Sequence, residues 1–341
     1  LEAFRSIEFR PRVLRDVATV DPSVTILGQE SALPLVFGPT GFTRMMHHEG
    51  EPAVARAAAD AGIPYTLSTL GTTTAEGVAA AAPSGRRWFQ LYLWRDKVAR
   101  EALVSRVAAS GYEALMLTVD TVTAGTRRRD VRNGLTIPPQ LTLKTLAGMA
   151  RFPRWWGNIL TTEPLEFASL RSTGGTVAEL INRVFDPSIT MDDIAWIRDN
   201  WRGKVIVKGI QNADDAALLA DAGVDAIVLS NHGGRQLDRS VVPLLLLPEV
   251  RQRVGTALEV YVDGGVRNGA DAIAAVALGA DAVLVGRAYL YGLMAGGEAG
   301  VRRAVTILRG EVEQTMRLMG IRTLAELEPG MVRLSAADNR S

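Results

Sequence analysis

The chain has 341 residues, a length that suits about two average domains or one α/β barrel. Apolar residues make up 47% and charged residues 22%, which excludes disordered and collagen-like proteins. The net charge of +1 gives no global positive field of the kind that binds nucleic acid. Because the sequence has no cysteine, disulfides, thiolate metal sites, iron–sulfur clusters and cysteine nucleophiles are excluded. Any redox chemistry must therefore come from a bound cofactor.

The sequence shows neither an export signal nor a membrane-spanning run. No stretch of about 18 uninterrupted apolar residues is present. Residues 1–5 lack both an initiator Met and the apolar core of a signal peptide. We therefore expect the chain to be N-terminally incomplete, as a segment of a longer protein.

A recurring unit organises the chain: an Ala-rich stretch with helical periodicity, a glycine, a short spacer and an aliphatic or β-branched run. The glycines of four such units are Gly62, Gly111, Gly223 and Gly279. Glycine ends a helix at low conformational cost, and a continuous apolar run suits a strand buried on both faces. With four further apolar runs, the predicted strands are residues 35–38, 65–68, 88–92, 114–119, 205–208, 226–230, 259–263 and 282–286.

Eight strands that alternate with helices predict an α/β fold, a (β/α)8 TIM barrel that forms one domain over residues 1–341. A doubly wound sheet is the alternative, but no Gly-x-Gly-x-x-Gly turn opens the pattern. The spacing is regular except for about 85 residues between the fourth and fifth strands. We expect residues 140–190 of this stretch to form an insertion over or beside the barrel mouth.

The middle of the insertion combines basic and aromatic residues. Arg151, Arg154, Trp155 and Trp156 lie there among aliphatic residues. This combination is typical of segments that lie at a membrane surface, and it also suits a partner-binding loop. A loop that packs over the mouth, with its Trp side chains in a core, is the alternative.

Three of the predicted strands end in residues that suit an anion. Residues 263–267 read Asp-Gly-Gly-x-Arg, and residues 286–287 read Gly-Arg. Glycine lets backbone N–H groups approach an anion closely, so the two turns together predict a phosphate site, whereas each alone could be a tight turn. Lys208 closes another apolar strand and must reach solvent or pair with an anion. A Schiff-base lysine and a cofactor-binding lysine both fit that position.

The sixth predicted strand is followed by Asn-His-Gly-Gly-Arg at residues 231–235. His232 and Arg235 place a base beside a guanidinium that can bind a carboxylate, and we interpret His232 as catalytic. His47 and His48 lack a cationic partner and a strand-end position. We interpret these two as structural.

Polar motifs follow several predicted strands in chain order: PTG (39–41), QLY (90–92), LTVD (117–120), SNHGGRQLD (230–238) and VDGGVR (262–267). With these motifs the chain resembles the FMN-dependent 2-hydroxy-acid dehydrogenase/oxidase family from about residue 4 to residue 334. Residues 132–134, 185–188 and 286–293 most resemble the bacterial quinone-linked L-lactate dehydrogenases of that family.

The resemblance implies a set of catalytic residues that agrees with the chemistry of hydroxy-acid oxidation, which needs a base and a carboxylate anchor. His232 is implied to be the base, and Asp120 to orient its imidazole. Arg127 and Arg235 are implied to hold the substrate carboxylate, and Tyr92 to bind the substrate oxygen.

The implied cofactor is FMN, and no metal is expected. Lys208 is implied to act in catalysis by stabilising the reduced, anionic flavin. Contacts to the ring and ribityl chain are implied for Thr40, Gly41, Ser68, Gln90, Thr118 and Ser230. Contacts to the ribityl and phosphate end are implied for Asp263, Gly265, Arg267, Gly286 and Arg287. Further cofactor contacts are implied for Pro39, Gly233 and Gly264.

The chain departs from the family pattern in three places. The family has a Tyr near its N-terminus that binds the substrate carboxylate, and this chain begins after the segment that would carry it. Leu70 stands where glycolate oxidase has Trp, which reshapes the substrate pocket and leaves chain-length preference open. Gly41 stands where several oxidases have Ala, and it does not decide reactivity with oxygen.

The resemblance predicts oxidation of an L-2-hydroxy acid, best matched by L-lactate, to the 2-oxo acid, with a quinone as electron acceptor. An oxygen-dependent 2-hydroxy-acid oxidase that acts on a larger substrate and releases hydrogen peroxide is the alternative. A catalytically silent flavin scaffold and an unrelated phosphate-binding barrel are disfavoured by the intact His-Gly-Gly-Arg turn. A homotetramer in the cytoplasm is implied, and a quinone acceptor would add peripheral contact with the inner face of the cell membrane.

Overall fold

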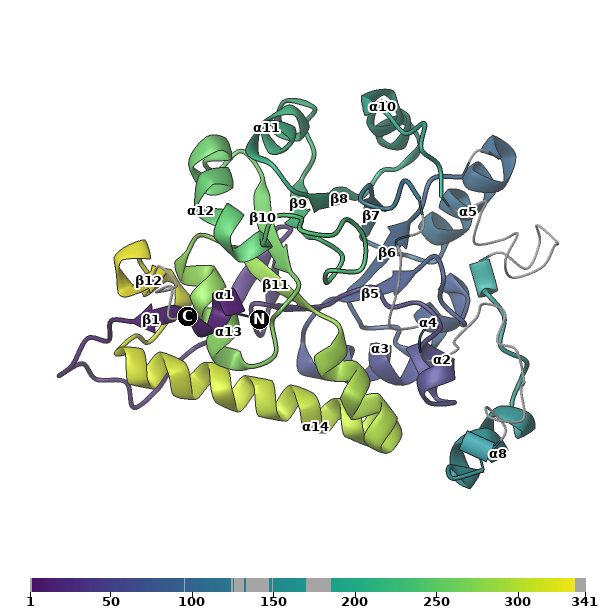
Figure 1. Cartoon of the computed structure of the whole chain (residues 1–341), viewed down its shortest axis with the longest axis horizontal. Helices are drawn as coiled ribbons and strands as arrows, with labels where there is room; N and C mark the ends of the chain where they lie inside the picture. The colour runs from purple at the N-terminus through teal and green to yellow at the C-terminus, as the bar shows by residue number, and fades with distance from the viewer. Residues whose placement is uncertain are drawn as a thin grey trace.

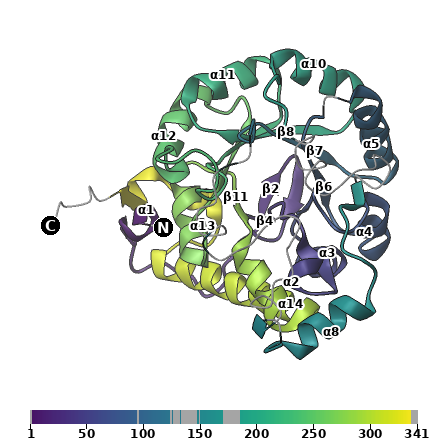
Figure 2. The same ribbon diagram turned by 45° about the vertical axis from the view of Figure 1, so that its right-hand side comes forward.

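The computed structural model describes residues 2–94, 96–123, 125, 132, 147–148, 150–169 and 185–334, with the backbone alone at 154 and 159. Eight parallel strands close into a barrel in the order β10-β11-β4-β5-β6-β7-β8-β9. Helices form an arc around these strands, as Figures 1 and 2 show. The predicted (β/α)8 barrel is therefore confirmed.

Each barrel strand coincides with a predicted apolar run, because strands buried on both faces need a continuous apolar sequence. The fifth strand is longer than predicted, since it continues past Lys208 through an irregular step at Gly209 to Ile210. The strands are β4 (Leu35–Phe37), β5 (Tyr65–Ser68), β6 (Arg87–Leu91), β7 (Ala114–Thr118), β8 (Lys204–Ile210), β9 (Ala226–Leu229), β10 (Glu259–Asp263) and β11 (Ala282–Val285).

The glycines of the recurring unit lie just past helices, as the sequence predicts. The four glycines of the recurring unit all have positive φ, which is the conformation expected just past a helix. Thr74 and Asn212 cap helices by accepting bonds from backbone N–H groups. The helices are α1 (Glu2–Arg5), α2 (Thr43–Met46), α3 (Gly50–Ala61), α4 (Ala75–Ala81), α5 (Lys97–Ala109), α8 (Pro153–Thr161), α10 (Met191–Asn200), α11 (Ala213–Asp221), α12 (Pro243–Val254), α13 (Gly269–Ala277) and α14 (Arg287–Met319).

The amino end of the barrel is closed by a hairpin that the sequence analysis did not predict. Strands β2 (Val24–Ile26) and β3 (Gln29–Ser31) pair antiparallel, and Ile26 and Leu27 are buried in the barrel interior. A second short pair joins β1 (Ile7–Phe9) to β12 (Val332–Leu334). Runs of three residues are too short to show the alternation by which a strand is recognised in sequence.

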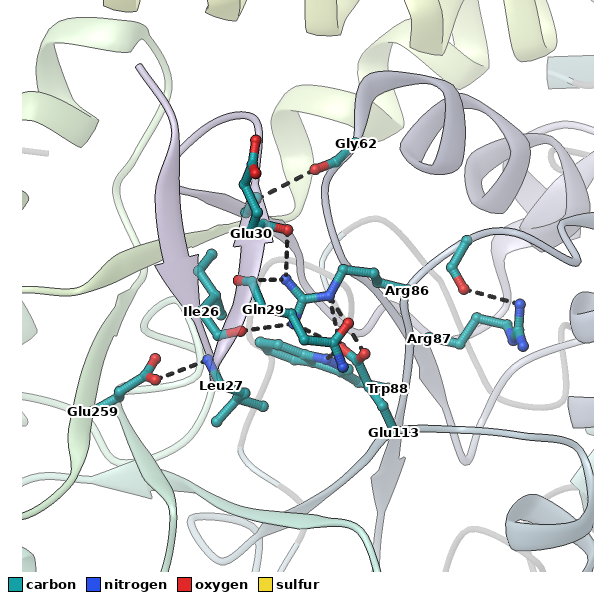
Figure 3. A network of polar contacts seen from close by, with 12 residues as sticks. Ile26, Leu27, Gln29, Glu30, Gly62, Arg86, Arg87, Trp88, Glu113 and Glu259 are labelled. Carbon is teal, nitrogen blue, oxygen red and sulfur yellow. Dashed lines mark hydrogen bonds and ion pairs between the residues drawn. The ribbon is translucent and has the colours of Figure 1, made fainter. Parts of the chain in front are cut away.

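Partly buried charged side chains at the amino end hold the hairpin in place (Figure 3). The Arg86 guanidinium donates to the carbonyl oxygens of Ile26 at 2.7 Å, Gln29 and Glu30, and pairs with Glu113 at 2.9 Å. Glu259 Oε1 accepts a hydrogen bond from the Leu27 backbone N–H at 2.8 Å. The interior above is filled by large side chains, so ligand space is expected at the opposite, carboxyl end of the strands.

The connection between β7 and β8 leaves the arc of barrel helices. Its helix α8 lies outside the arc, beside α2 and the kinked end of α14, in the view of Figure 2. Trp155 of α8 donates its indole N–H to the Met45 carbonyl of α2 at 2.8 Å. Most of residues 126–146 and all of 170–184 lie outside the described residues. Within the described part of the chain, no helix is long and apolar enough to cross a membrane.

Candidate active site

Strand-end side chains of β8, β9 and β10 form one charged, hydrogen-bonded group. Lys208 Nζ lies 2.9 Å from both Asp263 Oδ2 and Ser230 Oγ. The Ser230 hydroxyl donates to Asp263 Oδ2 at 2.8 Å. The parallel register places these strand ends side by side, so Lys208, Ser230 and Asp263 meet although 22 and 33 residues separate them in turn along the chain.

Lys208 and Asp263 stay charged although they are desolvated. Burial would lower the pKa of Lys208, but the carboxylates of Asp263 and Asp120 outweigh it and raise that pKa. Burial would likewise raise the pKa of Asp263, but the Lys208 ammonium and the Ser230 hydroxyl hold it below its usual value. The barrel mouth therefore contains a buried cation and its counter-ion.

His232 and Asp120 form the second predicted pair. His232 Nδ1 lies 3.0 Å from Asp120 Oδ1, and the Asp120 side chain is fully buried while His232 is partly exposed. Asp120 Oδ2 has no hydrogen-bond partner among the described residues. His232 adopts a left-handed backbone conformation, with φ of 56°, and its N–H donates to Ser230 Oγ at 3.0 Å. This strained conformation turns the imidazole toward Asp120 at the mouth.

Gly209 is needed for this pair, and the sequence analysis did not identify it. A Cβ at Gly209 would lie 2.7 Å from the Asp120 Cβ and 2.8 Å from its Cγ. Its φ of 110° is also one that side chains rarely adopt. The irregular step of β8 at Gly209 thus lets the backbone pass directly behind the Asp120 carboxyl.

The turn that carries Arg235 is fixed to the loop after β7. Gln236 Nε2 donates to the carbonyl oxygens of Asp120 at 3.1 Å and Thr123 at 3.0 Å, and Gln236 Oε1 accepts from the Gly125 N–H. Gln236 is therefore a positioning residue that the sequence analysis missed. Arg127, the other predicted carboxylate-binding arginine, lies outside the described residues.

Tyr92 follows β6 and is buried at the mouth, with its ring centroid 6.2 Å from that of Phe185. Gln90, two residues earlier in β6, is the middle member of a polar chain across three strands. Ser68 Oγ donates to Gln90 Oε1, and Gln90 Nε2 donates to Thr118 Oγ1, both at 3.0 Å. The predicted ring-contacting residues Ser68, Gln90 and Thr118 are thus adjacent, and Thr118 is paired in register with Lys208.

Thr40, in the predicted motif after β4, is fixed by Tyr289 of α14. The Tyr289 hydroxyl lies 2.8 Å from the Gly38 carbonyl oxygen and 2.7 Å from Thr40 Oγ1. Because a carbonyl can only accept, the phenol donates to Gly38 and the Thr40 hydroxyl donates to the phenol. Burial raises the pKa of Tyr289, which keeps the phenol protonated. Gly41, beside Pro39 and Thr40, leaves room for Leu70, whose Cβ would lie 3.1 Å from a Cβ at Gly41.

Three glycine turns meet at the last strand ends. Gly264 and Gly265 have φ of 94° and 97°. A Cβ at Gly233 would lie 3.2 Å from Arg287 Nη2, and one at Gly264 would lie 3.8 Å from the Gly233 Cα. Arg287 is the first residue of α14 and follows Gly286, so a helix N-terminus and a guanidinium face the same turns.

Comparisons with known proteins agree with this geometry. The family model for FMN-dependent dehydrogenase matches residues 1–334. The chain belongs to the FMN-dependent dehydrogenase family. It is 58% identical to a Mycobacterium tuberculosis protein provisionally named L-lactate dehydrogenase, over 96% of this chain and 79% of the relative. It is 40% identical to an L-lactate oxidase of Nostoc, over 97% of this chain and 88% of the relative.

Among solved structures, the chain is similar to one described as a monotopic membrane protein, (S)-mandelate dehydrogenase. The TM-score is 0.93 at 35% identity, over 97% of this chain and 89% of the other. These relatives share a chemistry, and the protein is an FMN-dependent 2-hydroxy-acid dehydrogenase or oxidase.

The residues at the mouth fit FMN. A buried ammonium at Lys208 suits a ring that becomes anionic on reduction. The turns at Gly233, Gly264 and Gly265 have positive φ, and the N-terminus of α14 with Arg287 suits a phosphate. Arg267 is exposed beside these turns. Among the described residues, no group of three or more His, Asp or Glu side chains could hold a metal ion.

Proposed function

We propose that this dehydrogenase oxidises L-lactate to pyruvate, with His232 as the base and a quinone as the electron acceptor. The main support is that the His232–Asp120 pair lies beside the Lys208–Asp263 pair at the carboxyl end of the barrel. FMN, when bound, supplies a ring that accepts two electrons. The other steps are those of the protein's own side chains.

His232 removes the proton of the substrate hydroxyl. The contact of Nδ1 with Asp120 fixes the tautomer in which Nδ1 carries the proton, so the lone pair of Nε2 faces the substrate. When His232 gains the proton, the buried Asp120 carboxylate stabilises the imidazolium. Lys208 contributes by holding a positive charge where the cofactor becomes negative.

Arg235 and Arg127 hold the substrate carboxylate, and Tyr92 binds the substrate oxygen. Bidentate binding of the substrate carboxylate by a guanidinium fixes the position of the substrate α-carbon in the site. The reaction then proceeds as if it were intramolecular. Leu70 lies beside Gly41 at this mouth, and the Phe185 ring lies 6.2 Å from that of Tyr92. The names of the relatives above favour L-lactate as the substrate.

The exposed face of α8 supports a quinone as acceptor. Phe152, Trp156 and Leu160 recur every four residues, so they share one helix face, and their exposed fractions are 64%, 37% and 74%. Large apolar side chains gathered on one exposed face are typical of a membrane-surface helix. The similar mandelate dehydrogenase is described as monotopic, which supports the same arrangement here.

Initial rates with L-lactate, glycolate and L-mandelate test the substrate, and each is measured with a quinone and with oxygen. We expect the highest kcat/KM with L-lactate and faster turnover with the quinone. Preference for mandelate together with rapid peroxide formation would instead support an oxidase that acts on a larger substrate.

Vesicle binding tests the face of α8. The double variant Phe152→Ser with Leu160→Ser should lose most co-sedimentation with anionic phospholipid vesicles. Leu218→Ser is the matched control, because Leu218 of α11 is also exposed, at 54%, but stands away from α8. Equal binding by the double variant and the wild type would rule out this face as the membrane contact.

A further inference from the structure

A cavity of about 530 Å³ lies apart from the strand-end groups described above. Its lining includes Arg44, His48, Glu49, Thr72 and Thr162. The volume is within the range of small-molecule sites in proteins. The sequence analysis interpreted His48 as structural, and the proposed function assigns nothing to this cavity.

Two loops connect the cavity to the cofactor site. One runs four residues from Thr40 to Arg44, and the other runs four residues from Ser68 to Thr72. They are tied together, because the Phe42 N–H donates to the Leu70 carbonyl at 2.9 Å and the Arg44 N–H donates to Thr72 Oγ1 at 3.2 Å. The cavity is therefore separated from the cofactor site by one layer of hydrogen-bonded loop.

The other side of the cavity adjoins α8. Thr162 is the C-cap residue that follows α8, and Arg44 Nη2 donates to the carbonyl oxygen of Glu163 at 2.9 Å. The indole of Trp155 is bonded to Met45, the neighbour of Arg44. The cavity thus lies between the helix with the exposed apolar face and the loops that hold the cofactor.

The polar groups of the lining indicate the class of ligand. His48 Nδ1 is buried and has no hydrogen-bond partner among the described residues, which is costly unless a ligand supplies one. Arg44 is a buried donor, whereas Glu49 and Glu163 are carboxylates. The carboxylates disfavour a phosphate or another dianion by charge repulsion. A neutral ligand with carbonyl groups can accept hydrogen bonds from the Arg44 guanidinium. Once reduced, its hydroxyl groups can donate hydrogen bonds to the carboxylates.

We propose that this cavity binds the head group of a quinone, with the isoprenoid tail directed along α8 toward the membrane. The inference rests on the proposed function, because a quinone must be the acceptor. The reaction balances: the hydroxy acid loses two electrons and two protons on becoming the 2-oxo acid, and the quinone gains two electrons and two protons on becoming a hydroquinone. His48 and Arg44 hold the two-carbonyl ring during that transfer.

The test compares Thr162→Trp, which fills the cavity from its rim, with Thr161→Trp, which adds the same side chain one residue outside it. L-lactate oxidation is measured with ubiquinone-0, a tailless quinone, and with ferricyanide, a small anion that needs no head-group site. Ubiquinone-0 binding is measured separately by equilibrium dialysis. We expect Thr162→Trp to raise the KM and Kd for ubiquinone-0 at least tenfold while ferricyanide turnover and Thr161→Trp stay as in the wild type.

His48→Leu, which removes the unpartnered nitrogen, should weaken ubiquinone-0 binding in the same direction and keeps the test decisive if Thr162→Trp does not fold. Unchanged KM and Kd for ubiquinone-0 in folded variants would overturn the cavity assignment alone. Equal losses with both acceptors would also overturn it, since they indicate damage to the active site. Failure of the wild type to reduce ubiquinone-0, with ferricyanide turnover intact, would overturn the quinone acceptor and the cavity with it.

Discussion

The two ends of the barrel both hold charged side chains that are partly or fully buried, but they differ in what those charges contact. At the amino end, all three guanidinium nitrogens of Arg86 bond to the hairpin carbonyls or to Glu113, and both carboxylate oxygens of Glu259 accept bonds. At the carboxyl end, Asp120 keeps one buried oxygen without a hydrogen-bond partner among the described residues.

One scaffold thus keeps the charges that stabilise it apart from the charges that do chemistry. Charges whose hydrogen bonds are completed by the protein fix a structure, because removing one partner leaves the other buried and unpaired. Charges with unused capacity are costly until a ligand completes them, and they therefore mark a site.

Replacement of His232 by Gln should reduce the rate of substrate oxidation by about 10²- to 10⁴-fold, because the base is lost while the side-chain volume is largely kept. FMN should stay bound, since the glycine turns and Lys208 are untouched. Rapid-mixing absorbance of the flavin measures the rate, and His47→Gln serves as the control. Oxidation at the wild-type rate by His232→Gln would refute the assignment of the base.

Replacement of Arg86 by Ala should lower the free energy of unfolding by about 3 kcal/mol, because Glu113 loses its ion-pair partner and three hairpin carbonyls lose a donor. Urea denaturation followed by circular dichroism measures the loss. The exposed pair Arg106–Glu76 is the control, and Arg106→Ala should cost less than about 1 kcal/mol. Similar losses for both variants would show that the amino-end network has no special structural role.

Replacement of Tyr289 by Phe should raise the Kd for FMN about fivefold, which corresponds to one hydrogen bond worth about 1 kcal/mol. The variant keeps the buried ring but frees the Thr40 hydroxyl and the Gly38 carbonyl. Flavin fluorescence on dilution measures the Kd. Tyr291→Phe, an exposed tyrosine of the same helix, should change nothing. If both variants bind FMN as the wild type does, Tyr289 does not position the cofactor loop.

Replacement of Glu259 by Gln should have the smallest effect, a change in stability that depends on pH. Burial raises the pKa of the Glu259 carboxyl in the folded protein. The folded state therefore binds a proton more tightly than the unfolded state, and the stability of the wild type falls relative to the variant as pH rises from about 4 toward the raised pKa. Thermal unfolding at a series of pH values measures this difference. Parallel stability curves would contradict a desolvated Glu259.

The sequence predicted the barrel well because its strands are continuous apolar runs bounded by glycine, a pattern that is local. It predicted the clusters at the mouth because strand ends of a barrel share one edge. The sequence analysis did not identify Tyr289, Gln236 or Gly209 as site residues. Tyr289 acts on Thr40 across 249 residues and Gln236 on Asp120 across 116, so no local pattern reveals them.

The hairpin at the amino end was not predicted, because Ile26 and Leu27 are two apolar residues in a short, largely polar stretch. Their burial depends on Arg86, Glu113 and Glu259, which come from three different strands or strand edges. Such a contact exists only once the barrel is closed. The pattern of the sequence therefore identified the end that binds ligands more readily than the end that is completed by the protein itself.

The visible spectrum of the purified protein in the absence of air, before and after L-lactate is added, tests the barrel mouth as the site of hydroxy-acid oxidation. We predict a flavin band that L-lactate bleaches rapidly and that D-lactate leaves unchanged. A flavin band that no L-2-hydroxy acid bleaches would contradict the assignment of the barrel mouth as an L-2-hydroxy-acid oxidation site.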